Sequence, residues 1–367
     1  MSIFLFLIIL AVLIIAHEYG HFVVAKKVGM RVDEFAIGFP PKIIVRKVGE
    51  TTYSLNLFPI GGYVKIFGED AAEARLGDAD SARSFSRKPR YAQAAVVGAG
   101  VVFNIILAWI LLSVGFMIGT PYSADDPIYG PRVHNPVLTV TSVFPDSPAA
   151  AAGMRSGDSI SFITVSGEKT ENPLPEEVGS LIQKSEGGEL IVGIIRGNNN
   201  PPPIRVTPRE GILEGKSAIG ISMDMVGTLR LFPHQALYEG ARMTWWFIRA
   251  TFVGMWGFLG SIFTGTADFS QVTGPVGIVN IVGDVSSLGF IYLLSLTALI
   301  SINLAIINMI PFPALDGGRL LFILIEAIKR SPIQPNVANA LNMIGFALLI
   351  LLMVVVTYHD IARLFES

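Results

Sequence analysis

Four stretches of the chain are apolar over roughly 20 residues or more, and polar segments separate them. They cover residues 3–25, 91–118, 288–310 and 337–358. A helix needs about 20 apolar residues to cross a hydrocarbon core about 30 Å thick. The pattern therefore predicts a polytopic α-helical membrane protein with about four transmembrane helices.

A fifth apolar stretch, residues 243–263, is interrupted by Arg249 and several glycines. We interpret it as an amphipathic helix or surface hairpin in the membrane interface, with Trp245 and Trp246 at headgroup depth. A full membrane span is the alternative.

Basic residues predict the orientation of the spans. Residues 26–90 hold twelve Lys and Arg, and Arg319, Lys329 and Arg330 lie between the third and fourth spans. Both segments should face the cytoplasm, because positive charge is retained on that side. Both chain ends and residues 125–230 then lie outside. The first apolar run has no basic residue before it, so we expect a retained span rather than a cleaved signal peptide.

Two segments between the spans predict β structure. "GETTYSLNLFPIGGYVKIFGED" alternates apolar and polar residues around a proline and two glycines, as in a hairpin. We predict a membrane-reentrant β element, with an ordinary cytoplasmic hairpin as the alternative. Residues 131–226 alternate short strands with an amphipathic helix, which predicts one small α+β domain.

The predicted domains are residues 1–119 (two spans and the β element), 120–230 (the outer domain), 231–285 (a membrane-surface segment) and 286–367 (two further spans). The chain of 367 residues is 51% hydrophobic but only 15% charged. Soluble domains carry about 25% charged residues, so the composition also indicates a membrane protein. The formal net charge of -2 argues against a nucleic-acid partner. Cysteine is absent, which excludes disulfides and thiolate metal ligands.

Ionisable residues inside the first apolar stretch point to chemistry. "HEYGH" places His17 and His21 four residues apart, hence on one face of a helix, with Glu18 beside the first of them. H-E-x-x-H on a helix predicts a zinc site in which the glutamate is the general base. Because unpaired charges inside a membrane are costly, a functional role is the default interpretation. Hydrogen bonding to neighbouring helices is the alternative.

A third metal ligand is expected from "NMIPFPALDGG", at the end of the third span. Its two prolines should end the helix, and its glycines permit a tight turn that carries Asp316. The first and third spans both end at the cytoplasmic side in this topology. Asp316 is therefore expected at the membrane depth of His17 and His21.

Together with "GPVGI" at residues 274–278 and "SPAAAAGMRSGDSI" in the outer segment, these motifs resemble the site-2 protease family of intramembrane zinc metalloproteases, in its bacterial regulator-of-sigma-E type. The resemblance covers nearly the whole chain. It implies one Zn²⁺ per chain held by His17, His21 and Asp316, with Glu18 as general base. It also implies that Asn308 contacts the substrate or transition state, that the element around Gly61 and Gly62 holds the substrate strand, and that the outer segment is a circularly permuted PDZ domain.

The resemblance further implies regulated intramembrane proteolysis in the bacterial inner membrane, with the active site near its cytoplasmic side. Expected substrates are single-span proteins, such as anti-sigma factors trimmed by an upstream site-1-type protease, and remnant signal peptides. The chain departs from many relatives in having one PDZ segment and "IGFPP" at residues 37–41.

Three alternatives stay open. The outer domain could gate access without binding peptide. The chain could be a membrane-anchored PDZ scaffold with structural zinc or none, although only three ligands are visible and structural zinc usually has four. A metal transporter is disfavoured, because the fourth span ("ALLILLMVVV") has no polar position.

Overall fold

The computed structural model describes residues 1–69, 81–197, 199–213, 216–266, 273–331 and 333–366. The chain forms two compact units. One unit comprises Met1–Leu112, Gly240–Gly283 and Leu294–Ser367, and the other comprises Ser113–Glu239 and Asp284–Leu293.

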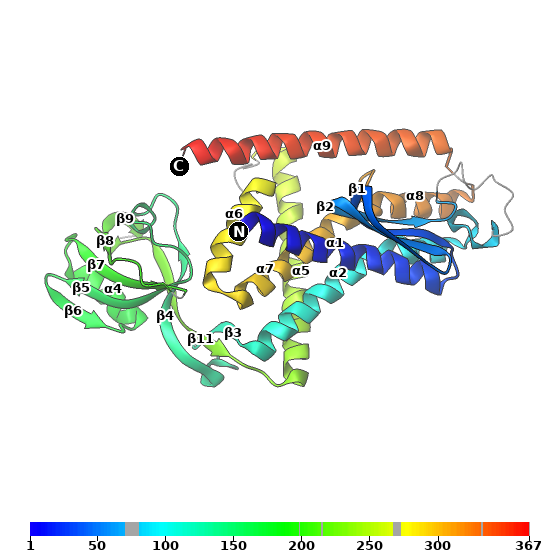
Figure 1. The fold of residues 1–367 in the computed structure, drawn as a ribbon. Helices are drawn as coiled ribbons and strands as arrows, with labels where there is room; N and C mark the ends of the chain where they lie inside the picture. The colour runs from blue at the N-terminus through cyan, green and yellow to red at the C-terminus, as the bar shows by residue number, and fades with distance from the viewer. Residues whose placement is uncertain (70–80, 198, 214–215, 267–272, 332, 367) are drawn as a thin grey trace. The chain divides into compact units, whose positions relative to one another are not determined.

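Four helices of the described chain are long and apolar enough to cross a membrane. They are α1 (Ser2–Lys27), α2 (Arg90–Ile118), α7 (Phe290–Met309) and α9 (Pro335–Glu366) (Figure 1). The prediction of four membrane-length helices is confirmed, and each predicted span falls within its helix to within about two residues at the ends.

The helices α1 and α2 approach each other closely at small residues. A Cβ added to Gly20 of α1 would lie 2.5 Å from the Ala99 carbonyl oxygen of α2. In a membrane no hydrophobic force drives helices together. Small residues instead let two helix backbones approach closely and gain van der Waals contact. α1 ends at Lys26 and Lys27, and Gly29 follows with a φ of 71° that reverses the chain.

The segment after α1 forms a four-stranded sheet from only two long strands, β1 (Val32–Val48) and β2 (Thr51–Ile66). Both strands bend, so the order across the sheet is residues 42–48, 51–58, 32–39 and 62–66. β1 bends at Gly38, whose φ is 83° and whose added Cβ would lie 2.7 Å from the Phe58 carbonyl oxygen. Only glycine fits there. The sequence predicted a hairpin, but not this doubled ladder.

Ion pairs tie the β1–β2 turn to its surroundings. The Glu50 carboxylate lies 2.5 Å from Lys26 Nζ at the end of α1 and accepts hydrogen bonds of 2.7 and 2.8 Å from Arg83. The Arg83 and Lys26 hydrogen bonds lower the pKa of Glu50 to about 2. The turn is thereby attached to both ends of the segment that joins α1 to α2.

Besides the four membrane-length helices, the described chain contains the longer helices α5 (Pro233–Thr264), α6 (Pro275–Leu288) and α8 (Asp316–Lys329). α5 is one continuous helix, so the surface-hairpin alternative for residues 243–263 is wrong. Trp245 and Trp246 of α5 are exposed.

α6 begins in the "GPVGI" motif. There the Asp360 carboxylate of α9 accepts hydrogen bonds from the Gly274 and Gly277 backbone N–H groups, at 3.1 and 2.8 Å. α8 was not predicted, and it fills the connection between the third and fourth predicted spans.

The second unit is rich in sheet. Its seven-stranded sheet has the order β3–β11–β4–β5–β7–β8, with β6 paired to β5. The strands are β3 (Thr120–Ser123), β4 (Val133–Val143), β5 (Asp158–Val165), β6 (Glu168–Glu171), β7 (Leu190–Arg196), β8 (Ile204–Val206) and β11 (Ile221–Leu229), beside a separate pair, β9 (Arg209–Leu213) and β10 (Lys216–Ala218). The short helix α3 (Pro148–Ala151) and the helix α4 (Pro175–Lys184) complete the unit.

The core of this unit lies between the sheet and α4. Val178 and Ile182 of α4 are buried against Leu138, Ile163 and Val192 of the strands. These are the apolar positions of the alternating pattern read from the sequence, so the predicted small α+β segment is present. Asp158 is fully buried and binds the Arg196 guanidinium through two hydrogen bonds of 2.6 and 2.7 Å.

Candidate metal centre

The helix α1 places two imidazoles one turn apart. His17 Nε2 lies 3.2 Å from His21 Nε2, and the ring planes are 82° apart. The four-residue spacing produces this proximity, because residues i and i+4 share a helix face. The geometry expected from "HEYGH" is present.

The turn between α7 and α8 supplies a carboxylate. α7 ends at Met309, the segment with Pro311 and Pro313 follows, and Asp316 opens α8. A Cβ on Gly317 would lie 2.2 Å from the Ile310 carbonyl oxygen, so the turn requires glycine. Asp316 Oδ2 lies 3.1 Å from His17 Nε2 and 3.4 Å from His21 Nε2. The three residues are brought together.

The separations of these three atoms fit zinc. Ligands about 2.0–2.1 Å from a tetrahedral zinc are about 3.3 Å from one another. The observed separations are 3.1, 3.2 and 3.4 Å. Asp316 Oδ2 is buried, and the two imidazole nitrogens lie close to it. Lone pairs that converge in this way repel unless a cation lies among them, so the residues present fit a zinc ion.

α2 forms the wall behind the imidazoles. The Val96 carbonyl oxygen lies 2.8 Å from His21 Nδ1, and the Asn104 amide nitrogen lies 3.3 Å from His17 Nδ1. Between them, a Cβ on Gly100 would lie 2.5 Å from His21 Nε2 and 2.6 Å from His17 Cε1. Sequence reasoning missed all three residues. Their spacing of four along one helix was visible, but nothing local indicated which helix faces the histidines.

Glu18 lines the same small cavity as the three ligands. This cavity of about 240 Å³ also contacts Tyr63 and Val64 of β2. A Cβ on Gly62 would lie 3.3 Å from Glu18 Cγ and 3.0 Å from Ile14 Cγ2, so the edge segment of the sheet packs on α1 beside the glutamate. The site therefore holds a carboxylate next to a strand edge.

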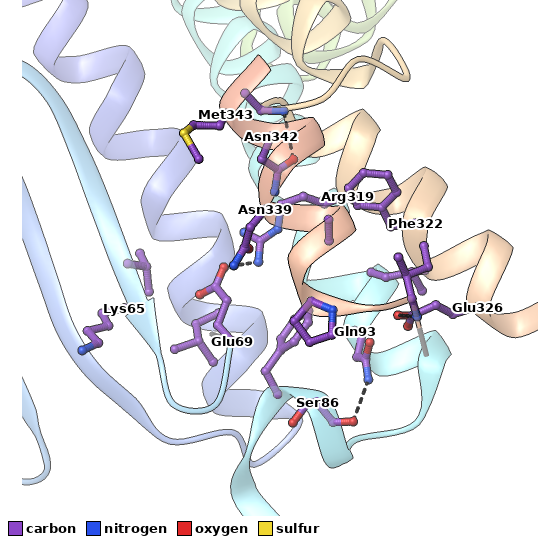
Figure 2. Close-up of a pocket in the computed structure, with 18 of the residues that line it drawn as sticks. Lys65, Glu69, Ser86, Gln93, Arg319, Phe322, Glu326, Asn339, Asn342 and Met343 are labelled. Atoms are coloured by element: carbon purple, nitrogen blue, oxygen red, sulfur yellow. Dashed lines mark hydrogen bonds and ion pairs between the residues drawn. The ribbon is translucent and has the colours of Figure 1, made fainter. Parts of the chain in front are cut away.

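A larger groove of about 910 Å³ adjoins this cavity (Figure 2). The two share Tyr63, Val64, Glu69 and Arg319, and the groove continues along α8 and the start of α9. Glu69 and Arg319 form an ion pair on the shared lining, which Figure 2 shows as a dashed contact. The metal cavity thus opens beside a groove large enough for a peptide segment.

Two predicted substrate residues are not among those that line the metal cavity. Asn308, in the last turn of α7, is half-buried and is not among the residues that line the metal cavity. Gly61 contacts the Phe39 ring, because an added Cβ would lie 2.3 Å from Phe39 Cε2. The roles predicted for Asn308, Gly61 and Gly62 stay predictions.

Comparison with known proteins identifies the family. The model of peptidase family M50 matches residues 5–352. The chain belongs to peptidase family M50, the site-2 proteases. A Clostridium perfringens protein that carries a zinc metalloprotease name is 35% identical over 358 residues, with 97% of each chain covered.

Two further relatives of this M50 chain carry the name RasP, and one of these names includes a regulatory role. "Zinc metalloprotease RasP" of Geobacillus kaustophilus is 29% identical, with 99% of this chain and 98% of the relative covered. "Regulator of sigma-W protease RasP" of Bacillus subtilis is 30% identical, with 98% of both chains covered. The family resemblance stated from the motifs is confirmed.

Proposed function

We propose that this M50 chain is a zinc-dependent intramembrane endopeptidase that cleaves transmembrane segments of single-span membrane proteins. One observation carries the proposal. Three ligand atoms with zinc-like separations, from α1 and the start of α8, converge beside Glu18, and α1 is itself long enough to span a membrane. The names of the relatives contain the words "zinc metalloprotease", which supports the choice of metal.

In this proposal His17, His21 and Asp316 hold one Zn²⁺. When bound, Zn²⁺ acts as a Lewis acid that polarises the scissile carbonyl and lowers the pKa of water to about 7. Glu18 accepts the proton of the attacking water and delivers it to the leaving amine. Its position on α1, one residue after His17, keeps the carboxylate in the cavity that the ligands line.

The substrate strand is proposed to add to the edge of the β1–β2 sheet. A peptide bond inside a helix is shielded by the helix's own hydrogen bonds, so the substrate must unwind before it is cut. Tyr63 and Val64 lie in the edge segment of the sheet and line the metal cavity, and strand addition there would replace the lost backbone bonds. A membrane-reentrant position of this sheet, and contacts of Gly61, Gly62 and Asn308 with substrate, belong to the same proposal.

The strand proposal has its own test. Tyr63→Pro and Val64→Pro each remove one backbone N–H, and successive residues of a strand point to opposite edges. We expect the proline whose N–H faces outward to abolish cleavage while one Zn²⁺ per chain is retained. Unchanged cleavage in both variants would contradict strand addition.

The catalytic proposal is tested with purified protein in lipid vesicles and a model single-span substrate. Wild-type protein should cleave it, and Glu18→Gln should lower the rate by at least about 100-fold, within the range expected for a lost general base. Zinc content, measured by mass spectrometry, should be equal in the two proteins. Equal cleavage by both, or cleavage by neither, would favour a membrane-anchored scaffold.

The sheet-rich outer unit is proposed to be a PDZ domain that selects substrates. A groove of about 480 Å³ lies between α4 and β11 and is lined by apolar residues that include Ile182, Ile221 and Met223. An extended peptide could lie there beside the strand. Gly179 lines this groove with nothing within 4 Å of an added Cβ, so Gly179→Trp should fill it. Peptide binding by the wild-type protein that is lost in Gly179→Trp would support the assignment. If the wild-type protein binds no peptide, a domain that only gates access would be favoured.

The protein is proposed to lie in the bacterial inner membrane, with both chain ends and the outer unit outside and the metal centre near the cytoplasmic side. Substrates would include anti-sigma factors already trimmed by a site-1-type protease, and remnant signal peptides. The sigma-W role in the name of the Bacillus subtilis relative supports the first class. Protease accessibility of tags placed at the two ends would test the orientation.

A further inference from the structure

Asn104 of α2 is buried at the metal centre but is not one of its ligands. Its side chain has no exposed surface, and its amide nitrogen lies 3.3 Å from His17 Nδ1. Its side-chain oxygen, Oδ1, is buried without a hydrogen-bond partner in the described chain. An unsatisfied buried amide oxygen costs about 1–3 kcal/mol, so its retention at this position calls for an explanation.

The tautomers of the two histidines supply that explanation. A neutral imidazole carries its proton on one nitrogen and a lone pair on the other. His21 Nδ1 faces the Val96 carbonyl oxygen, which can only accept, so the proton lies on Nδ1 and the Nε2 lone pair is free for the metal. His17 needs the same tautomer to bind through Nε2, and the group that faces its Nδ1 is the Asn104 amide.

Rotation of the Asn104 amide by 180° exchanges its oxygen and nitrogen. With the nitrogen toward His17, the amide donates to the Nδ1 lone pair, and the ring proton lies on Nε2, directed at Asp316 3.1 Å away. With the oxygen toward His17, Oδ1 accepts the Nδ1–H group and the Nε2 lone pair is left for zinc. The orientation with nitrogen toward His17 therefore places a proton on Nε2. The orientation with oxygen toward His17 leaves Nε2 free to bind a metal ion.

The backbone of Asn104 is also held in place. The buried Ser301 hydroxyl of α7 donates a hydrogen bond of 2.8 Å to the Asn104 carbonyl oxygen. α7 is the helix that leads into the turn with Asp316, so this bond links the α2 wall to the element that carries the third ligand. A buried hydrogen bond therefore holds the Asn104 backbone against α7.

We infer that Asn104 is a positioning residue that fixes His17 in its metal-binding tautomer by presenting Oδ1 to Nδ1–H. The inference rests on the proposed zinc site. A partner of this kind orients the ring and raises its basicity, and its loss typically weakens metal affinity 10–100-fold.

Two near-isosteric variants separate this role from simple packing. Asn104→Leu keeps the volume and removes the acceptor, whereas Asn104→Asp offers only acceptors toward Nδ1–H. Asn303→Leu is the matched control, because Asn303 on α7 bonds to Thr251 at 3.0 Å. Zinc affinity is measured on the full chain in detergent, by competition with a chromophoric chelator.

We expect Asn104→Leu to bind zinc 10–100-fold more weakly, and Asn104→Asp and Asn303→Leu to bind within about threefold of wild type. Asn104→Asp as weak as Asn104→Leu would overturn the inference, as would Asn104→Leu with wild-type affinity. The Asp variant keeps the test decisive if the Leu variant does not fold. His17→Ala isolates the underlying proposal: if it binds zinc as wild type does, the zinc site itself is refuted.

Discussion

Gly100 offers the sharpest structural test of the metal centre, because its missing side chain makes room for both imidazoles. In Gly100→Ala the new Cβ would lie 2.5 Å from His21 Nε2 and 2.6 Å from His17 Cε1. Nonbonded atoms are most stable about 3.5–4.0 Å apart, so the overlap is about 1 Å. Zinc–ligand distances tolerate changes of about 0.2 Å. The substitution therefore displaces both rings by several times what a zinc site allows.

The expected result is a loss of zinc affinity of at least 10–100-fold, or about 1.4–2.8 kcal/mol. Affinity is measured by chelator competition and zinc content by mass spectrometry. Gly98→Ala on the same helix is the control, because its added Cβ meets nothing within 4 Å. Both changes raise helix propensity by about 1 kcal/mol, so only the collision distinguishes them. Gly100→Ala with wild-type zinc affinity would show that the rings do not lie against α2 as described.

Three further predictions concern the surroundings of the site and the sheet-rich unit. Gly62→Ala should slow cleavage without releasing zinc, because its Cβ would press on α1 beside Glu18 at 3.3 Å from Cγ; parallel loss of zinc would contradict this. Asp158→Ala should destabilise the sheet-rich unit by about 3–5 kcal/mol in urea denaturation, since it leaves the Arg196 guanidinium without its bidentate partner; a change below about 1 kcal/mol would refute the pairing. The Arg83 hydrogen bonds lower the pKa of Glu50 to about 2, so its stabilising contribution is complete above the unfolded pKa of about 4.5 and is lost as pH falls toward 2. Glu50→Gln should therefore make melting temperature less dependent on pH between about 4.5 and 2, and an unchanged dependence would exclude this role.

The groove beside the metal cavity is a feature of the tertiary structure. It shares the Glu69–Arg319 ion pair with the cavity and extends along α8. The groove could not be predicted, because it depends on contacts between distant segments, and α8 was not predicted although its sequence carried a signal. The "RLLFILIEAIK" segment has an amphipathic pattern that is typical of a surface helix, but its position between two spans was interpreted as a simple connection.

Local patterns determined much of this protein. Membrane-length apolar runs predicted α1, α2, α7 and α9, because bilayer thickness sets a length that a single segment must meet on its own. The pair His17 and His21 also follows from local geometry, since a four-residue spacing on a helix brings two rings together whatever surrounds them. Asp316 required one further step, the shared depth of two spans that both end on the cytoplasmic side.

Only the tertiary structure decided what lies around those residues. The pairing of residues 32–39 with two different parts of β2, and the placing of Val96, Gly100 and Asn104 behind the imidazoles, depend on contacts between segments distant in sequence. A buried asparagine or glycine on an apolar helix has the same local pattern whether it faces lipid, a neighbouring helix or a metal ligand. The packing of α1 against α2 removes that ambiguity, because it determines which side chains share the limited space around the histidines.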